Sequence, residues 1–412
     1  MNEFDWIVIG EEPGGMWLMD RLCRESFGGK PTRVGWIRMG KPLRPLCVSK
    51  SLAGQLQLGD APTWSCEIQS PTQSWSWDSH ALLQECQAMG VELRPANPAN
   101  FRQALVRQRF RENPDLYLRL QTIWKFLGTS DVLSEGRLLH ALAPCTELMW
   151  WDPQNQLRVH DIATIDTDDA WTLEFNRYGK AVIHFKNQDA WVASRCLWNT
   201  TQAKTAKFLN TQPELEKTMP APQYDVSPWA LCPFDLQMEP LGVPVNVPPL
   251  IFFVAADGIV DPHTEVLPIE IHRNESDVLL RVWVSVRQPF SLDSAVDRGN
   301  AAIGQLKKLF PYFDQTLKSI WPPLFVGDCY SDPERERVQS SFENSLRETY
   351  RLSALHLESR VPAFQVLPPN FECHLPHPAG PLLCAQKILE EWKAQQCKLH
   401  RKTDANPPSL NA

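Results

Sequence analysis

A glycine-rich turn near the N-terminus carries the residues whose type and spacing could bind a phosphate. Gly10, Glu12 and Gly15 stand at the three positions of a G-x-G-x-x-G pattern, with Pro13 and Gly14 between the last two. In such a turn the first glycine makes the tight bend, the second lets the backbone approach a pyrophosphate, and the third packs the helix closely. The pattern indicates a dinucleotide site in which the first and third glycines are kept.

The middle position of this pattern opposes phosphate binding. Glu12 brings a Cβ atom and a carboxylate into the space where the phosphates would lie, and Glu11 adds a second negative charge. Two like charges at about 4 Å repel by roughly 4 kcal/mol at an effective dielectric near 20. Gly14 could move into register and relieve the steric conflict, but the charge would stay. The turn is compatible both with a weakened cofactor site and with a fold that has lost its ligand.

The segments around the turn are those of a βαβ unit. Residues 4–9 form a short apolar run, as expected of a buried parallel strand, and residues 16–25 show the apolar periodicity of a helix. Residues 33–37 form a second strand after a Gly-Gly-Lys-Pro turn. A dinucleotide-binding domain begins in this way, and its pyrophosphate lies at the helix N-terminus. The acid expected about twenty residues further on for the ribose is replaced by Arg38.

Length and composition restrict the class of protein. The chain has 412 residues, enough for two or three domains, with 43% hydrophobic and 22% charged residues. A net charge of −7 argues against nucleic acid or an anionic membrane surface as the main partner. We expect no membrane-spanning helix, which needs about 18 apolar residues, and the acidic N-terminus predicts no signal peptide. The eleven cysteines form no C-x-x-C pair, so we expect free thiols and a cytoplasmic location.

The rest of the chain divides into a helical part and two β-rich parts. Helices are predicted over 79–89, 100–127 and 131–143, and the arginines at 102, 107, 109, 111 and 119 would form a phosphate-binding face or, as the pattern favours, a solvated face. Strands are predicted over 147–151, 161–166, 171–177, 181–186 and 191–198, before a polar turn and a helix up to 210. A second group of strands covers 229–236, 250–256, 266–272 and 278–286. Helices over 294–310, 335–355 and 381–394 and an apolar run over 363–367 complete the chain.

Other kinds of chemistry have little support in the sequence. His374 and His377 have no carboxylate partners nearby, so loop histidines explain them better than a metal pair. Asp257, Asp261 and His263 are explained by a turn between strands. Neither a G-x-S-x-G nor a phosphate-loop pattern is present. We therefore expect no metal site, no acyl transfer and no nucleotide hydrolysis, and the sequence identifies no catalytic acid or base.

The order of these segments resembles the superfamily of FAD-dependent amine oxidases and phytoene desaturases, which have NAD(P)/FAD-binding Rossmann-like folds, over nearly the whole chain. Residues 194–209 are similar to a strand and helix of that superfamily, and read SRCLWNTTQAKTAKFL. Residues 363–392 are similar to its closing FAD motif, and read AFQVLPPNFECHLPHPAGPLLCAQKILEEW. That motif normally has Gly-Asp or Gly-Glu at the strand end, where Pro368 and Pro369 stand here. Gly327-Asp328 keeps the pair, but the helix after it lacks small residues, so the 363–389 segment is the preferred match.

The resemblance implies an α/β fold, in which an FAD/NAD(P)-binding Rossmann-like domain is combined with a second, antiparallel-sheet substrate domain. The first domain would consist of residues 1–60, 130–210 and 320–395, with a mainly helical insert at 61–129. Residues 211–319 would form the β-rich substrate domain. Residues 396–412 would form a disordered tail.

The resemblance also implies a flavoprotein oxidoreductase of the amine oxidase or desaturase type, with FAD as cofactor and a small apolar or amine molecule as substrate. The alternative is a non-catalytic relative that lost flavin binding and serves as a scaffold for a ligand or a partner protein. The residues that would bind FAD are Gly10, Glu12, Pro13, Gly14 and Gly15 at the pyrophosphate, Arg38 at the ribose, Ile162 at the adenine through its backbone, and Gly380 and Pro381 at the flavin ring.

Overall fold

The computed structural model describes residues 2–27, 29–39, 45–69, 74–76, 147–166, 171–200, 226–254, 266–324, 332–350, 364–367, 371–372 and 379–405, with single residues between 84 and 88 and between 204 and 211. The helices predicted over 79–89, 100–127 and 131–143, and the arginine face on them, lie almost entirely outside the described residues. The groups at 257–263, 327–328, 368–370 and 374–377 lie outside them as well.

The described helices vary widely in length. They are α1 Pro13–Arg24, α2 Lys50–Leu56, α8 Pro153–Leu157, α12 Leu292–Leu309, α13 Phe313–Thr316, α14 Asp332–Ser345 and α15 Ala379–Ala405, with a 3-10 turn, η1, at Pro240–Gly242. α15 continues well past residue 395, so residues 396–405 are helical and not part of a disordered tail. Within the described part of the chain, no helix combines the length and the apolar character needed to cross a membrane.

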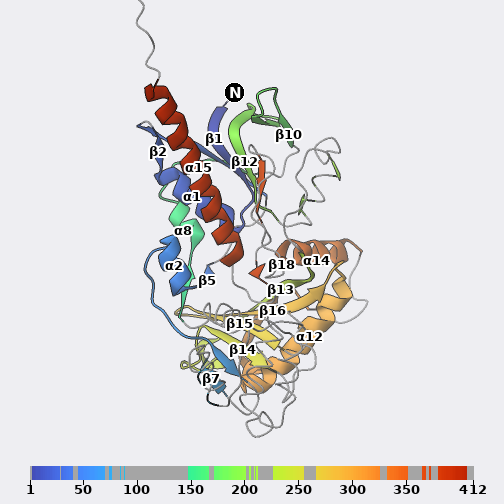
Figure 1. Ribbon diagram of the computed structural model, residues 1–412. Helices are drawn as coiled ribbons and strands as arrows, with labels where there is room; N and C mark the ends of the chain where they lie inside the picture. The colour runs from blue at the N-terminus through green and yellow to red at the C-terminus, as the bar shows by residue number, and fades with distance from the viewer. Residues whose placement is uncertain are drawn as a thin grey trace, which may run out of the picture.

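Seven strands form a mixed sheet at the end of the molecule that carries the N-terminus (Figure 1). They are β1 Asn2–Ile9, β4 Val34–Arg38, β9 Ala163–Asp166, β10 Trp171–Phe175, β11 Ala181–Phe185, β12 Trp191–Trp198 and β19 Phe364–Val366. The order is β10-β11-β12-β1-β4-β9, and β19 pairs with the C-terminal part of β12. β4 lies parallel to β1, with Ile9 opposite Ile37, which confirms the predicted βαβ unit.

Helices α1 and α15 contact one another on one face of this first sheet (Figure 1). Successive residues of a strand point to opposite faces. Trp6 and Val8 of β1 therefore join the core under α1 and α15, whereas Ile7 and Ile9 join the core on the other face. Trp392 of α15 meets the Trp6 ring edge-on, with 5.9 Å between the ring centroids. The last helix thus completes a core that begins in the first strand.

A second sheet of nine strands lies at the other end of the molecule (Figure 1). Its order is β20-β18-β13-β16-β15-β14-β6-β7, and β17 also pairs with β13. The strands are β6 Glu67–Gln69, β7 Ser74–Ser76, β13 Val226–Met238, β14 Leu250–Val254, β15 Val266–Arg273, β16 Val278–Arg287, β17 Leu317–Trp321, β18 Arg347–Tyr350 and β20 Phe371–Glu372. The separate sheet predicted for the strands between 228 and 286 is confirmed. α12 contacts β16 and covers one face.

Two small antiparallel pairs complete the described strands. β2 Ser26–Phe27 pairs with β3 Lys30–Pro31, just before β4. β5 Leu46–Ser49 pairs with β8 Leu148–Trp151, so the predicted strand at 147–151 exists but belongs to neither large sheet.

The helix predicted over 335–355 is wrong between Ser345 and Tyr350, where the described part of this segment ends. α14 ends at Ser345, and the chain continues as β18, which pairs antiparallel with β13. Thr349 and Tyr350 are residues that favour strands, and β13 supplies hydrogen-bond partners in place of the next helical turn. β18 and β20 therefore belong to the second sheet, as do β6 and β7 from the expected helical insert. The domain boundaries derived from the sequence stay a prediction.

Candidate cofactor-binding site

The glycine turn joins β1 to α1 at the edge of the first sheet where its parallel strands end. Gly10 has a φ of 107°, a left-handed conformation that favours glycine. A Cβ atom there would lie 2.7 Å from the carbonyl carbon of Asn199, which leaves no room for another residue. The Gly10 N–H donates to the Ile37 carbonyl at 2.8 Å, and Trp36 Nε1 donates to the Gly10 carbonyl at 2.9 Å. The first glycine therefore still makes the tight bend.

Asn199 closes the turn from the end of β12. Its backbone N–H donates to the Ile9 carbonyl at 2.8 Å, and its Nδ2 donates to the Glu12 carbonyl at 2.6 Å. A Cβ atom on Gly15 would lie 2.7 Å from Asn199 Cγ, so the third glycine is needed for close packing. The sequence identifies Asn199 only as part of a polar turn. Its position directly after a buried strand is the signal that could have marked it.

The start of α15 lies against the start of α1. A Cβ atom on Gly14 would lie 2.6 Å from the Pro381 carbonyl oxygen. Pro13 is at the beginning of α1 and is buried together with Gly14 and Gly15. Gly380 belongs to the first turn of α15, directly before Pro381. The structure thus brings together the segments that the sequence assigns to the pyrophosphate and to the flavin ring.

Glu12 is the N-cap residue of α1, with extended backbone angles (φ −75°, ψ 155°) and no side-chain capping bond. The residue is 5% exposed, and its Oε2 atom is buried without a hydrogen-bond partner among the described residues. Burial raises the pKa of the Glu12 carboxyl above its usual value, while the positive charges of Arg347 and Lys204 act in the opposite direction. A buried carboxyl group thus fills the position where a glycine would admit a phosphate.

The end of β4 shows what has replaced the expected ribose acid. Glu11 Oε1 accepts a hydrogen bond from the Met39 N–H, directly after β4. Arg38 donates through two nitrogens to the two carboxylate oxygens of Asp166, at the end of β9. The Arg38 guanidinium also lies over the Trp36 ring, 5.4 Å from its centroid. The Met39 N–H and the Arg38 guanidinium, which a ribose would otherwise meet, therefore both donate to carboxylates of this chain, those of Glu11 and Asp166.

Ile162 lies away from the turn. It directly precedes β9, whose Ala163 is opposite Gly35 near the start of β4. Because β4 and β9 are parallel, Ile162 is at the edge where the strands begin, whereas the turn is at the edge where they end. The Ile162 carbonyl accepts a hydrogen bond of 3.0 Å from Thr164 Oγ1. The structure therefore does not bring Ile162 together with the glycine turn.

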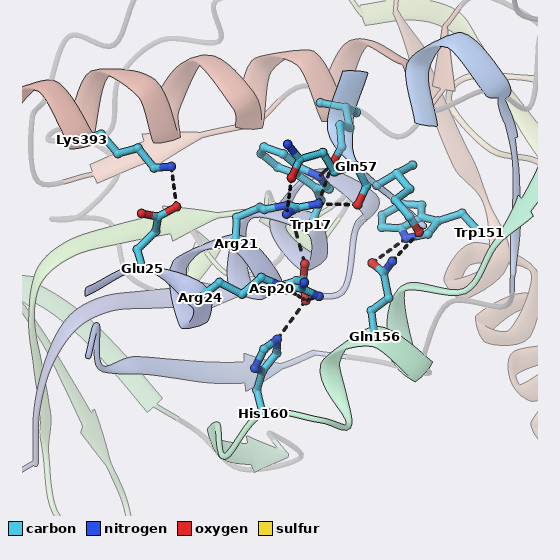
Figure 2. A network of polar contacts seen from close by, with 12 residues as sticks. Trp17, Asp20, Arg21, Arg24, Glu25, Gln57, Trp151, Gln156, His160 and Lys393 are labelled. Carbon is cyan, nitrogen blue, oxygen red and sulfur yellow. Dashed lines mark hydrogen bonds and ion pairs between the residues drawn. The ribbon is translucent and has the colours of Figure 1, made fainter. Parts of the chain in front are cut away.

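A network of polar contacts holds α1 to its neighbours (Figure 2). Asp20 is buried, and its Oδ1 accepts a hydrogen bond of 2.8 Å from Arg24 and lies 2.9 Å from His160 Nε2. Arg21 donates to the Leu56 carbonyl at 2.7 Å. These contacts tie α1 to the last residue of α2 and to the segment that follows α8. They fix the helix axis, and with it the direction of the helix N-terminus toward the turn.

A second group of buried charges lies on the face of the second sheet opposite α12. Asp235, Arg281 and Glu270 are in register on β13, β16 and β15. Arg281 donates to Asp235 at 2.9 Å and forms an ion pair of 3.7 Å with Glu270. Glu270 also accepts from Trp283 Nε1 at 3.0 Å and lies 3.3 Å from His272 Nε2. Burial lowers the pKa of Arg281, but the two carboxylates raise it more, so the guanidinium stays charged.

Both faces of β16 are therefore buried, although the alternation over 278–286 predicts a single core face. Trp283 and Leu231, on the side of the charged group, belong to the same apolar cluster as Trp17 of α1. The Trp150 ring of β8 stacks on His272, with 4.2 Å between the ring centroids. The side of the second sheet that carries the charges thus faces elements of the first sheet and its helices.

Comparison with solved structures places the chain in a known architecture. A triple mutant of putrescine oxidase made for redesign of cofactor binding matches with a TM-score of 0.54 at 13% identity, covering 95% of this chain and 99% of that chain. Wild-type putrescine oxidase bound to putrescine matches with a TM-score of 0.53 at 12% identity, covering 95% and 99%. A protein from Pyrococcus furiosus matches with a TM-score of 0.50 at 13% identity, covering 93% and 96%. The chain has the amine oxidase fold.

This finding confirms the fold class predicted from the sequence, which combines a Rossmann-like domain of the FAD/NAD(P)-binding type with a second domain built on a largely antiparallel sheet. No family model and no curated protein sequence matches the chain. At 13% identity or less, the likeness to putrescine oxidase describes the fold alone.

The residues at the turn of this amine oxidase fold do not fit an FAD pyrophosphate. A dinucleotide needs backbone N–H donors and a glycine that lets it approach the start of the helix. Here Pro13 has no N–H group, and Glu12 presents a buried carboxyl. Gly14 is packed against the Pro381 carbonyl rather than open to a ligand. Among the described residues, no group of three or more His, Cys, Asp or Glu could hold a metal ion.

Proposed function

We propose that this chain is a non-catalytic protein with the amine oxidase fold, which has lost FAD binding and serves as a scaffold for a ligand or a partner protein. The observation that supports this most strongly is the buried Glu12 carboxyl at the second glycine position. A phosphate placed there would face a carboxylate oxygen without a partner instead of a backbone N–H group. Repulsion between the two would be strong, because the surroundings exclude water.

Half-buried aromatic side chains on and beside the second sheet are the candidate contacts for a small ligand. Trp150 and His272 are half-buried, and the Glu270 carboxylate lies behind them. The face of an aromatic ring attracts an organic cation, whereas the charge of Glu270 is already balanced by Arg281. A small amine, one of the two substrate kinds expected from the resemblance, is the ligand that we propose.

The visible absorption spectrum of the purified full-length protein tests the loss of FAD binding. We expect no flavin absorbance, and no saturable change in flavin fluorescence when FAD is added. A yellow protein that contains one flavin per chain would overturn the proposal. Calorimetric titration with putrescine tests the ligand, with the diol of the same chain length as an uncharged control. Equal binding of diol and diamine, or binding of neither, would contradict an amine site.

The second candidate is an FAD-dependent oxidoreductase that acts on an apolar or amine substrate. It is favoured by the match to putrescine oxidase over 95% of this chain and by the two glycines of the turn that keep their structural roles. The same spectrum separates the two candidates. Bound flavin that is bleached when an amine is added without oxygen would support the oxidoreductase, and colourless protein would support the scaffold.

A further inference from the structure

The backbone framework of a dinucleotide site is intact around the turn. Gly10 keeps its left-handed conformation, and β4 keeps its parallel register beside β1. Gly15 keeps its close packing at the start of α1. The turn and the strand register of such a site are therefore kept, and the side chains of Glu12 and Glu11 are what differ from it at the turn.

Glu12 lies beside groups that would also attract a bound phosphate, although the loss of water on burial outweighs them for the Glu12 carboxyl itself. Its carboxyl is buried at the N-terminus of α1, where the helix dipole favours a negative charge. Lys204, a few residues after β12, and Arg347, in β18 of the second sheet, both act on this carboxyl through their positive charges. An anion at a helix N-terminus that is approached by cations from two other elements is typical of a phosphate site. Here the anion belongs to the chain.

At the ribose position, donor and acceptor are exchanged between the strand end and the turn. In a dinucleotide site, a carboxylate at the end of the second strand accepts hydrogen bonds from the ribose hydroxyls. In this chain the strand end supplies the donor, the Met39 N–H, and the turn supplies the acceptor, Glu11 Oε1. The Glu11 side chain thus spans the distance from the turn to the end of β4, which a bound nucleotide would otherwise span.

We propose that the carboxylates of Glu12 and Glu11 occupy the places of the pyrophosphate and the ribose, so that the chain closes its own nucleotide site with two built-in anions. This rests on the proposed loss of FAD binding, and it adds what has replaced the cofactor. It also implies that the site is closed by charge and can be reopened by removing that charge.

ADP is the probe for this proposal, because it carries a pyrophosphate and a ribose without the flavin ring. Its affinity would be measured by calorimetry for the wild type, Glu12→Gln, Glu12→Gly and the double variant Glu11→Ala/Glu12→Gly. Glutamine keeps the volume of the side chain and removes the charge, whereas glycine also removes the Cβ atom. We expect an increase of at least about tenfold for Glu12→Gln, equivalent to ~1.4 kcal/mol. Glu12→Gly and the double variant should bind more tightly still.

Two further variants separate this mechanism from a general effect of charge. Glu3→Gln removes the same charge from an exposed position at the other end of β1, and should leave ADP affinity unchanged. Arg347→Met in the Glu12→Gly background should lower ADP affinity, because a cation whose charge acts at the Glu12 position would then be missing for the phosphate. Circular dichroism shows whether each variant is folded.

The outcomes distinguish this proposal from the proposed function. If folded Glu12→Gln and Glu12→Gly bind ADP no better than the wild type, the proposal of two built-in anions is wrong. The proposed loss of FAD binding is unaffected by this result. A gain in Glu12→Gly alone would show that volume closes the site, and would also contradict the role of charge. If the wild type binds both ADP and FAD tightly, both proposals are wrong.

Discussion

Replacing Glu12 by glutamine should stabilise this protein at neutral pH. The side chain is buried, its Oε2 atom lacks a hydrogen-bond partner, and the charges of Arg347 and Lys204 only partly offset the loss of water. An unpaired buried polar group lowers stability by about 1–3 kcal/mol, and by more when it is charged. Glutamine keeps the shape and removes the charge. The amide is still a buried polar group, so only the extra cost of the charge is recovered, and we expect the free energy of unfolding to rise by about 1 kcal/mol.

The gain in unfolding free energy on replacing Glu12 by glutamine should depend on pH, and should be larger at higher pH. Burial raises the pKa of Glu12 in the folded protein above the ordinary value of 4.5. The folded state therefore holds its proton more tightly than the unfolded state, and the wild type loses stability as pH rises from 4.5 through the folded pKa. Below pH 4.5 both states of the wild type are protonated, and the difference between wild type and Glu12→Gln should vanish.

Urea unfolding followed by the fluorescence of the sixteen tryptophans provides the assay. Glu11→Gln is the matched control, because Glu11 is also buried but accepts a hydrogen bond from the Met39 N–H. Weakening this bond should leave stability at neutral pH equal to that of the wild type or lower. The reasoning would be refuted by a Glu12→Gln variant that is less stable at neutral pH, or by a gain of the same size below pH 4.5.

Four other substitutions test the packing and the buried charges in the same urea assay. Gly15→Ala should destabilise the protein by about 1–3 kcal/mol or more, because its Cβ would overlap Asn199. Gly54→Ala, which meets nothing within 4 Å in α2, should instead stabilise it by about 0.5–1 kcal/mol. Arg281→Met should destabilise by about 3–5 kcal/mol, since the buried Glu270 and the half-buried Asp235 lose their cation. Asp20→Ala should destabilise by at least about 1–3 kcal/mol, because its basic partners on and beside α1 lose a buried acceptor. A neutral result in any of the three destabilising cases would contradict the contacts described for that residue.

The parts of the fold that the sequence predicts correctly are those with a local pattern. The apolar run at 4–9, the helix after the turn and the strand at 33–37 follow from periodicity alone, and their parallel pairing follows from the βαβ rule. The helix predicted over 294–310 appears as α12 with nearly the same ends for the same reason. Local sequence patterns do not predict the structure of a segment whose conformation depends on pairing with a distant segment. Arg347–Tyr350 forms β18 because β13 pairs with it.

The candidate site shows the same difference between local patterns, which the sequence reveals, and long-range contacts, which it does not. The damaged glycine pattern, and the charge at Glu12, are visible in the sequence because the motif is contiguous. The contacts of Asn199 with the turn, of Glu11 with Met39 and of Arg38 with Asp166 join residues that are 28 or more positions apart. Ile162, which the resemblance assigns to the adenine, lies at the opposite edge of the sheet from the turn.

The position of β1 inside the first sheet has a consequence for the synthesis of the chain. β1 needs β12 on one side, β12 needs β19 beside its C-terminal part, and Trp6 needs Trp392 of α15 to complete its core. At about 5–20 residues per second, a ribosome takes roughly 20 to 80 seconds to proceed from Trp6 to Trp392. Throughout that time the N-terminal unit carries an unpaired strand edge and an uncovered apolar face. The nascent chain is therefore a natural client for chaperones that bind such surfaces, and any truncation before α15 leaves the same surfaces exposed permanently.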